Sequence, residues 1–280
     1  MRHNKQRVNQ RRRFPKFRIT TWLILVNVIL FFIFYITFAI VPDSPQYILL
    51  QGKKILQGES HWTLLTSMFM HQGLIHLFVN MFSLFFLGNF TEQLIGKKRF
   101  IWLYLIAGIF AGIFFVLGTL IGTGFSWGPR VFGDIDAMAA GASGALFGLL
   151  GLLAMLIPRY RIYLIIGPII VFIILAITET LPPSPVIFAL NIILNIALFA
   201  MIFSLFMPSQ KLRKFSIPVA LPMWLAPVIA IVPLIIISFV IDLPIGNSAH
   251  LGGLIVGLVY GTYIRLKYPQ KMLLLKRFFR

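Results

Sequence analysis

Long apolar blocks, separated by short polar segments, dominate the pattern of this chain. Charged residues or clusters of Pro and Gly bound each block, and several blocks approach or exceed the ~20 residues with which a helix crosses a bilayer. Such runs predict transmembrane helices. Eight spans are predicted, at residues 20–41, 70–94, 100–122, 139–157, 162–178, 185–207, 216–240 and 248–265.

The composition supports a membrane location. Of the 280 residues, 59% are hydrophobic and 11% are charged, whereas soluble domains carry about 25% charged residues. Too little polar surface is left to cover a water-soluble globule, so the predicted fold class is an all-α polytopic membrane protein. The chain has no Cys, which excludes disulfides, thiolate metal sites and cysteine nucleophiles.

The net charge of +18 is distributed as a topology signal rather than as a nucleic-acid-binding face, because the cations lie in short clusters between the spans. With the N-terminus inside, 22 of the 25 Lys and Arg residues fall on the inner side. The exceptions are Lys53, Lys54 and Arg130. Positive charge accumulates on the cytoplasmic side, so we expect a multi-pass cell-membrane protein with both termini cytoplasmic and no nucleic-acid partner.

The two ends of the chain are strongly basic. We expect residues 1–18 to form a cytoplasmic arm against anionic lipid headgroups, 19–265 a transmembrane domain, and 266–280 a basic cytoplasmic tail. The arm is followed by about 22 apolar residues, longer than the core of a signal peptide, so this segment is interpreted as an anchor helix.

Two stretches with regularly spaced small residues carry the candidate chemistry. Gly141, Gly144, Gly148 and Gly151 would form one stripe on the fourth span, and Ala249, Gly253, Gly257 and Gly261 a matching stripe on the eighth. Such stripes let membrane helices approach closely. Ser143 borders the first stripe and His250 the second, so packing of the two stripes would bring the hydroxyl and the imidazole together.

Each of these residues also has a structural interpretation. A serine in a membrane helix often bonds the carbonyl one turn back, whereas a histidine in a membrane span is rarer and favours a functional role. At equal depth, the two favour a nucleophile and base pair, in which the imidazole takes the hydroxyl proton. No Asp or Glu lies near either residue in the threading, so a dyad is predicted.

Acyl transfer also needs donors for the developing oxyanion. His76 and Asn80 lie on one face of the second span, and the Ser143 N–H lies near a helix N-terminus. The alternative for His76 and Asn80 is hydrogen bonding between helices. A metal site fits poorly, because His71 and His76 would lie about 140° apart around a helix.

The chain resembles the rhomboid intramembrane serine proteases. The resemblance is carried by HQGLIHLFVNMFSLFFLGNFTE (71–92), GASG (141–144) and AHLGGLIVG (249–257), in that order, and covers roughly residues 20–160 and 216–265. It implies a six-helix core, Ser143 as nucleophile, His250 as general base, and an oxyanion hole of His76, Asn80 and the Ser143 N–H. It also implies single-pass membrane-protein substrates, no cofactor, and a water-filled cavity open to the outer side.

Three departures from the family pattern stand out. Trp62 is followed by Thr63 where the family often has Arg, which leaves the partner of Glu92 undetermined. Phe147 stands where many members have a tyrosine that stacks on the base. Residues 162–207 form an extra helical hairpin, whose even number of spans preserves the later orientation. Within it, Asn191 and Asn195 could bond another helix or only each other's backbone.

Two further segments are interpreted through the resemblance. The amphipathic stretch YILLQGKKILQG (47–58) resembles the family's membrane-embedded first loop, with a surface helix as the alternative. Prolines should weaken the seventh span beside the family's substrate access route: Pro218, Pro222, Pro227 and Pro233.

The leading function is therefore an intramembrane serine endopeptidase. A silent relative that binds transmembrane clients is the alternative, although such a protein should lack the nucleophile or the base. A transporter is disfavoured, because no inverted repeat is visible.

Overall fold

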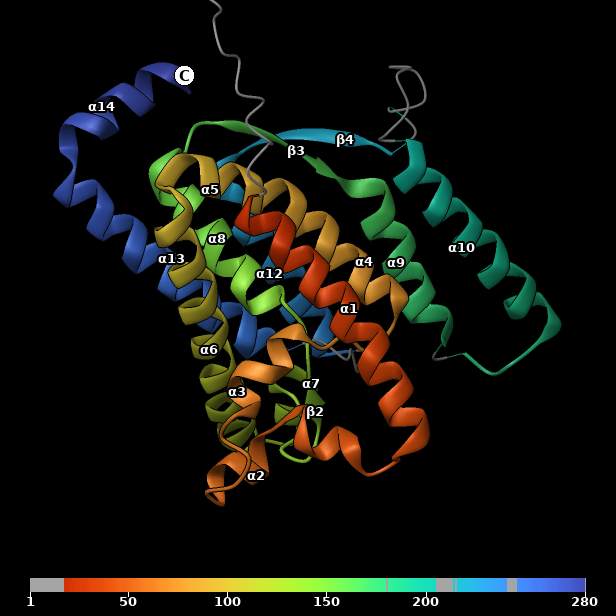
Figure 1. Ribbon diagram of the computed structural model, residues 1–280. Coiled ribbons are helices and arrows are strands. Elements are labelled where there is room, and N and C mark those ends of the chain that lie inside the picture. The colour runs from red at the N-terminus through yellow and green to blue at the C-terminus, as the bar shows by residue number, and fades with distance from the viewer. Residues whose placement is uncertain (1–17, 180, 205–213, 215, 241–245, 280) are drawn as a thin grey trace, which may run out of the picture.

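The computed structural model describes residues 18–179, 181–204, 214, 216–240 and 246–279, and helices make up most of this part of the chain (Figure 1). Five helices or helical runs are long and apolar enough to cross a membrane: α1 (Ile19–Ile40), Leu74–Ile95, α6 (Lys97–Gly122), α10 (Pro185–Ser204) and α13 (Asn247–Lys267). Shorter apolar helices cover Ser143–Leu156, Ile166–Leu175 and Met223–Ser238. Each of these eight segments overlaps one predicted span, which confirms a polytopic helical fold.

The run Leu74–Ile95 is one helix with a local change of winding. It comprises α4 (Leu74–Ser83), the π-helical turn η3 (Leu84–Gly88) and α5 (Asn89–Ile95). At Gly88 it passes close to α1, where a Cβ atom would lie 2.9 Å from the Thr20 methyl carbon. The run therefore packs directly against the first span.

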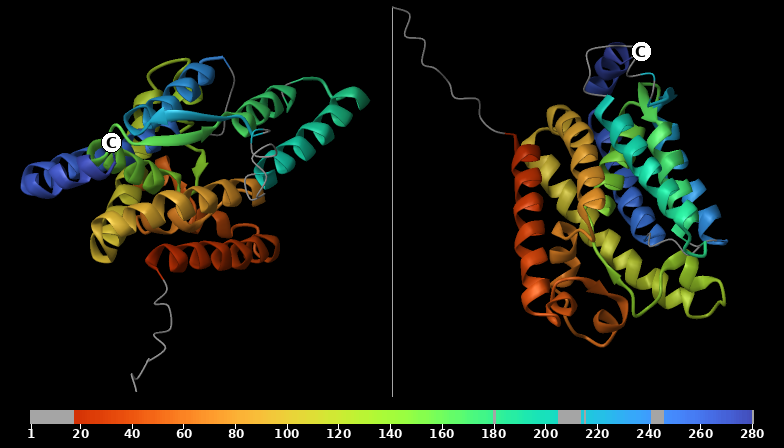
Figure 2. Two further views of the ribbon diagram at one scale, coloured as in Figure 1. Left: turned by 90° about the horizontal axis from the view of Figure 1, so that it is seen from above. Right: turned by 90° about the vertical axis from the view of Figure 1, so that its right-hand side faces the viewer.

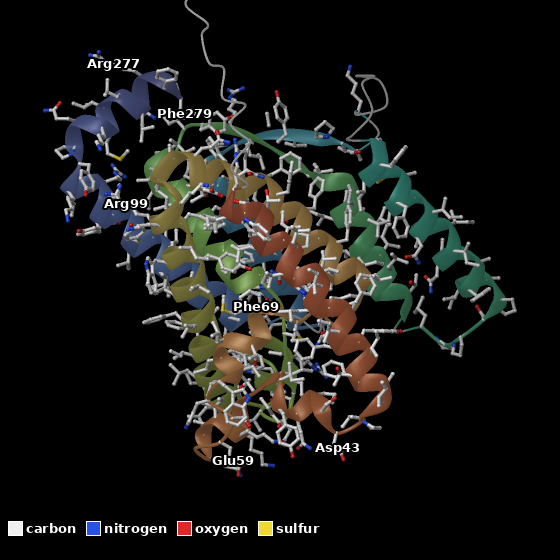
Figure 3. The ribbon with its side chains drawn as sticks, viewed as in Figure 1. Asp43, Glu59, Phe69, Arg99, Arg277 and Phe279 are labelled. Atoms are coloured by element: carbon white, nitrogen blue, oxygen red, sulfur yellow. The ribbon has the colours of Figure 1, made fainter. Side chains whose placement is uncertain are left out.

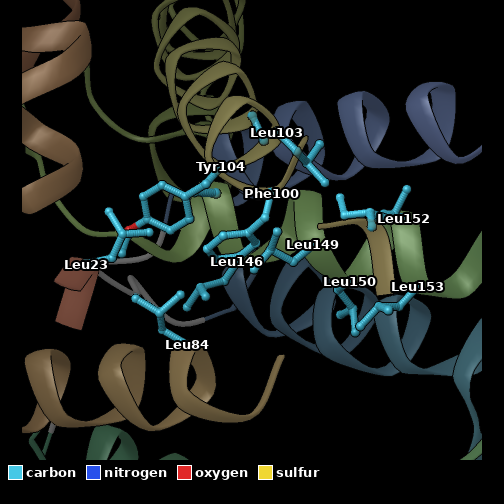
Figure 4. Close-up of a cluster of buried hydrophobic side chains, with 14 of the residues drawn as sticks. Leu23, Leu84, Phe100, Leu103, Tyr104, Leu146, Leu149, Leu150, Leu152 and Leu153 are labelled. Atoms are coloured by element: carbon cyan, nitrogen blue, oxygen red, sulfur yellow. The ribbon is translucent and has the colours of Figure 1, made fainter. Parts of the chain in front are cut away.

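Helices α6, α8 (Ser143–Leu156) and α13 pack together at the centre of the molecule. Small residues allow the contact: a Cβ on Gly144 or Gly148 would collide with Ala111 or Ala107 of α6. Helix α8 is the most enclosed, because most of its side chains are buried. Its leucines form the core with Phe100 and Tyr104 of α6, which are fully buried (Figure 4).

Two short antiparallel sheets lie among the helices. Strand β1 (Leu50–Gln51) pairs with β2 (Met138–Ala139), and β3 (Arg161–Ile165) pairs with β4 (Pro218–Pro222). The predicted spans 162–178 and 216–240 thus begin as strands rather than as helices. Pro218 and Pro222 explain the second case, since proline has no N–H to donate within a helix.

The first loop consists of several short elements, and the amphipathic stretch 47–58 within it is only partly helical. Between α1 and α4 it consists of η1 (Ser44–Tyr47), β1, α2 (Gly52–Leu56), α3 (Thr63–Thr66) and η2 (Ser67–Phe69). Only residues 52–56 of the stretch 47–58 are α-helical, because Leu50 and Gln51 are extended to pair with β2. On the same side, α7 (Gly128–Phe132) follows α6.

The extra hairpin consists of α9 (Ile166–Glu179) and α10, which project together to one side of the bundle (Figures 1 and 2). The Thr178 hydroxyl donates to Asn191 Oδ1 at 2.5 Å, and the Asn195 amide donates to the Asn191 carbonyl at 2.8 Å. Asn191 therefore bonds the other helix of the hairpin, and Asn195 bonds the backbone of its own helix. Its predicted residues 205–207 lie outside the described residues.

Most of the predicted basic tail, residues 266–280, is helical. Helix α14 (Pro269–Phe278) turns away from α13 at Tyr268, and Phe279 packs edge to face on Phe90 and Tyr160. Residues 1–17 of the predicted basic arm lie outside the described residues.

The 3₁₀ turn η4 (Met223–Leu225) leads into α12 (Ala226–Ser238), which contains Pro233 and contacts α8 and α13.

Candidate active site

The N-terminal ends of three helices carry the predicted site residues. Ser143 is the first residue of α8, His250 lies in the first turn of α13, and His76 lies in the first turn of α4. His250 Nε2 lies 2.9 Å from Ser143 Oγ, within hydrogen-bond distance. The structure thus brings together two residues 107 positions apart. A hydroxyl held in this way can lose its proton to the imidazole as it attacks an electrophile.

The glycines of the two stripes set this register. A Cβ on Gly253 would collide with the Gly144 carbonyl, and one on Gly257 with the Gly148 carbonyl. Gly144 follows the serine directly, and Gly253 lies three residues after the histidine. Backbone-to-backbone contact therefore fixes the two side chains relative to each other, as the pattern of small residues predicts.

The aromatic ring of Phe147 packs against one face of the His250 imidazole. Phe147 stacks on it with ring centroids 4.4 Å apart and planes 24° apart. Because Phe147 lies four residues after Ser143 on α8, one helix supplies both the hydroxyl and the stacking ring. Among the described residues, His250 Nδ1 has no hydrogen-bond partner, so none of them serves as a third, orienting carboxylate.

Buried polar contacts fix the start of α13, and the sequence interpretation did not include them. The Asn247 amide, buried at the first position of the helix, donates to the Val131 carbonyl at 3.0 Å and to the Ser238 hydroxyl at 2.9 Å. These bonds tie α13 to α7 and α12. The sequence contained one signal for these contacts: a polar residue, Asn247, three positions before the candidate base in a largely apolar chain.

His76 and Ser143 flank the same glycine. A Cβ on Gly141 would lie 2.9 Å from His76 Nε2 and 3.8 Å from Ser143 Oγ. Gly141 has φ +130° and precedes α8, so its predicted place on the helix stripe is wrong. A positive φ and the close imidazole both disfavour any side chain here.

Asn80 is buried one turn after His76 on α4. Its amide nitrogen donates to the His76 carbonyl at 2.9 Å. An amide nitrogen has two N–H groups, so one remains for another acceptor. The Ser143 N–H, at the first position of α8, has no carbonyl one turn back within the helix.

The first loop supports the chain that leads into Ser143. The Gly141 N–H donates to the Ser67 carbonyl at 3.0 Å, and the Gln72 amide donates to the Met138 carbonyl at 3.0 Å. Lys53 forms a salt bridge with Asp136 at 3.1 Å. These contacts stabilise the β1–β2 pair. The sequence interpretation missed them because they join irregular loops.

Glu92 has a partner that the sequence did not reveal. Its carboxylate accepts the backbone N–H groups of Ile19 and Thr20 and the Thr20 hydroxyl, at 2.8 to 3.0 Å. An acid at a helix N-terminus stabilises the helix dipole. Thr63 does not replace the missing arginine, since its hydroxyl donates to the Ser60 carbonyl.

The rings of His71 and His76 lie 5.2 Å apart, edge to face. Within the described part of the chain, no group of three or more His, Cys, Asp or Glu side chains is arranged to hold a metal ion.

Comparison with known proteins fits this arrangement. The family model described as the Rhomboid domain matches residues 58–194 and 183–267, which together cover most of the chain. This chain belongs to the rhomboid family. The prediction from its three motifs is thereby confirmed.

Several rhomboid relatives match shorter stretches. "Inactive RHOMBOID-like protein 8" of Arabidopsis thaliana is 38% identical over 89 residues, 32% of this chain and 25% of the relative. "RHOMBOID-like protein 6, mitochondrial" of the same plant is 44% identical over 59 residues, 21% and 19% of the two chains. "Rhomboid protease GluP" of Bacillus subtilis (strain 168) is 40% identical over 63 residues, 22% and 12%. The matches thus span a quarter or less of each relative.

Proposed function

We propose that this rhomboid is an intramembrane serine endopeptidase that uses Ser143 and His250 as a catalytic dyad. The observation that carries the proposal is the 2.9 Å contact between His250 Nε2 and Ser143 Oγ. The stacked ring of Phe147 and the glycine packing of α8 on α13 support it, because both fix the pair before any substrate binds.

In the proposed reaction, Ser143 Oγ attacks the carbonyl carbon of the scissile peptide bond while His250 Nε2 takes the hydroxyl proton. The imidazolium then gives this proton to the leaving amine as the carbon–nitrogen bond breaks. A water molecule attacks the resulting ester while His250 Nε2 takes one of its protons. The imidazolium then returns that proton to Ser143 Oγ as the carbon–oxygen bond breaks and the carboxylic acid product leaves. This sequence consumes one water for each bond cleaved and needs no cofactor.

The oxyanion of each tetrahedral intermediate would accept hydrogen bonds from His76, Asn80 and the Ser143 N–H. Gly141 lies beside both the imidazole of His76 and the hydroxyl of Ser143, and because it has no side chain, it does not fill the space between them. Donors fixed in advance stabilise developing charge without reorganising during the reaction.

The substrates we propose are single-pass transmembrane proteins, cut in or near their membrane segment. The five long apolar helices support a multi-pass membrane protein. The distribution of basic residues supports cytoplasmic termini in a cell membrane and a site opening to the outer side.

A catalytically silent protein that binds transmembrane clients is the second candidate. The printed name of one relative, "Inactive RHOMBOID-like protein 8", is the observation in its favour. The presence of both Ser143 and His250 argues against it, since loss of either would abolish the dyad.

Cleavage of a generic single-pass substrate by the purified protein, beside Ser143→Ala and His250→Ala, tests the proposal. We expect cleavage by the parent and none by either variant. Fluorophosphonate labelling of Ser143 gives a second readout that does not depend on the substrate. A folded parent that neither cleaves nor becomes labelled would exclude the protease and favour client binding.

A further inference from the structure

Three cations surround one tyrosine at the corner between α13 and α14. The Arg99 guanidinium lies 5.2 Å from the centre of the Tyr268 ring, and Lys271 Nζ lies 5.3 Å from it. Lys267 Nζ lies 5.9 Å from the same centre and 5.0 Å from that of Tyr263, whose hydroxyl it bonds. Arg99 also donates to the Tyr268 hydroxyl at 3.1 Å. Tyr268 follows the last residue of α13 and precedes the first residue of α14. The three cations around it come from α6, α13 and α14.

These charges are not neutralised within the described chain. None of the three cations is within salt-bridge distance of a described carboxylate, and all three side chains are exposed. Glu92, at the same end of the bundle, is buried and bonded to the start of α1. Three like charges around one ring repel each other, and an aromatic face offsets only part of this repulsion. An added anion would therefore be stabilised here.

The surroundings indicate the source of the anion. Trp102 lies one turn after Arg99 on α6 and is 63% exposed, and Leu266 beside Lys267 is 78% exposed. Tryptophan beside cations at the end of a membrane span is typical of the level of the lipid headgroups. A phospholipid whose phosphate lies on the cations could place its acyl chains against Trp102, whereas a soluble anion has no acyl chains.

The position on the molecule agrees with this source. Arg99, Arg277 and Phe279 lie toward one end of the bundle, and Asp43 and Glu59 lie at the other (Figure 3). Helix α14 exposes Leu273, Leu274 and Phe278 together with Lys271 and Arg277. A short helix with exposed apolar and basic residues is suited to the membrane interface.

We propose that Arg99, Lys267 and Lys271, arranged around Tyr268, bind the phosphate of one anionic phospholipid. The lipid would join α6, α13 and α14 on the side of the membrane away from the dyad. This site is separate from the proposed catalysis and does not depend on it.

Native mass spectrometry of the full chain in detergent tests the site, with phosphatidylglycerol and phosphatidylcholine added in parallel. We expect one phosphatidylglycerol to be retained in preference to phosphatidylcholine. Each cation removed should weaken binding about fivefold, since a basic residue near anionic lipid contributes about 1 kcal/mol. The test variants are Lys271→Gln alone and the triple variant Arg99→Gln, Lys267→Gln and Lys271→Gln.

The matched control removes three exposed cations elsewhere on the same membrane face: Arg159→Gln, Arg161→Gln and Lys214→Gln. Equal weakening by the two triple variants would overturn the proposal in favour of the general charge of this face. Glycerol phosphate supplies the headgroup chemistry without acyl chains, and equal retention of it would overturn the assignment to a lipid. If the first triple variant does not fold, unchanged binding by Lys271→Gln is sufficient to reject the site.

Discussion

The imidazole of His250 and the ring of Phe147 lie face to face, with centroids 4.4 Å apart. Stacking of this kind restricts the rotation of the imidazole and keeps Nε2 directed at Ser143. The pair thus joins the proposed base to the helix that carries the proposed nucleophile.

Replacing Phe147 by Leu should lower kcat/KM for peptide cleavage by about two- to tenfold, because aromatic pairs contribute about 0.5–1.5 kcal/mol beyond their burial. Phe147→Tyr keeps a ring and should retain most of the activity. Steady-state kinetics with one transmembrane substrate would compare the two. Full activity of the Leu variant would show that the ring does not position the base.

Asn80→Ala should reduce kcat by about 100- to 1,000-fold, the usual effect of removing an oxyanion donor. The control is Asn89→Ala, since Asn89 also donates from its amide to the carbonyl one turn back. Both variants lose one intrahelical bond, and Asn89→Ala also loses the bond that Asn89 accepts from Arg18. Only Asn80→Ala loses a candidate oxyanion donor. Equal activity of the two variants would assign Asn80 to helix structure alone.

Gly257→Ala should destabilise the protein by about 1–3 kcal/mol, the range for overpacking, because its Cβ would collide with the Gly148 carbonyl. Unfolding in a detergent titration would measure the change. Gly73→Ala is the control: Gly73 is extended, and no atom lies within 4 Å of its Cβ position. A stable Gly257→Ala protein would contradict the close contact of α8 and α13.

Glu92→Gln should lower the free energy of unfolding by about 1–3 kcal/mol, since the amide replaces an acceptor by a donor facing the start of α1. The exposed Glu59→Gln provides the control. Fluorophosphonate labelling of the folded fraction should be unchanged, because Glu92 lies at the opposite end of the bundle from Ser143. Loss of labelling in a stable protein would indicate a role in the site instead.

The sequence predicted those parts of the site that follow from periodicity and from side-chain chemistry. The stripes containing Gly144 and Gly253 appear at helical spacing, and their contact follows from the absence of side chains. Ser143 and His250 stand out because polar side chains are rare in membrane spans.

Other contacts have no periodic signal. The partner of Glu92 is a helix N-terminus, whose free N–H groups belong to the backbone and not to a residue type. The support from Ser67 and Gln72 joins irregular segments, so neither hydrophobic spacing nor charge indicates it. The helix boundary at Gly141 depends on a φ value that the pattern of glycines does not distinguish from a helical one.

The ladder of β3 and β4 also bears on how the extra hairpin relates to the rest of the chain. Arg161 pairs with Pro222, and Ile165 pairs with Pro218, so the segments that leave and re-enter the bundle run side by side. An insertion whose two ends are neighbours can lengthen, shorten or disappear without displacing the helices on either side. The two ends of the hairpin therefore meet at one place beside the bundle, and a change in its length would leave the geometry around Ser143 unchanged.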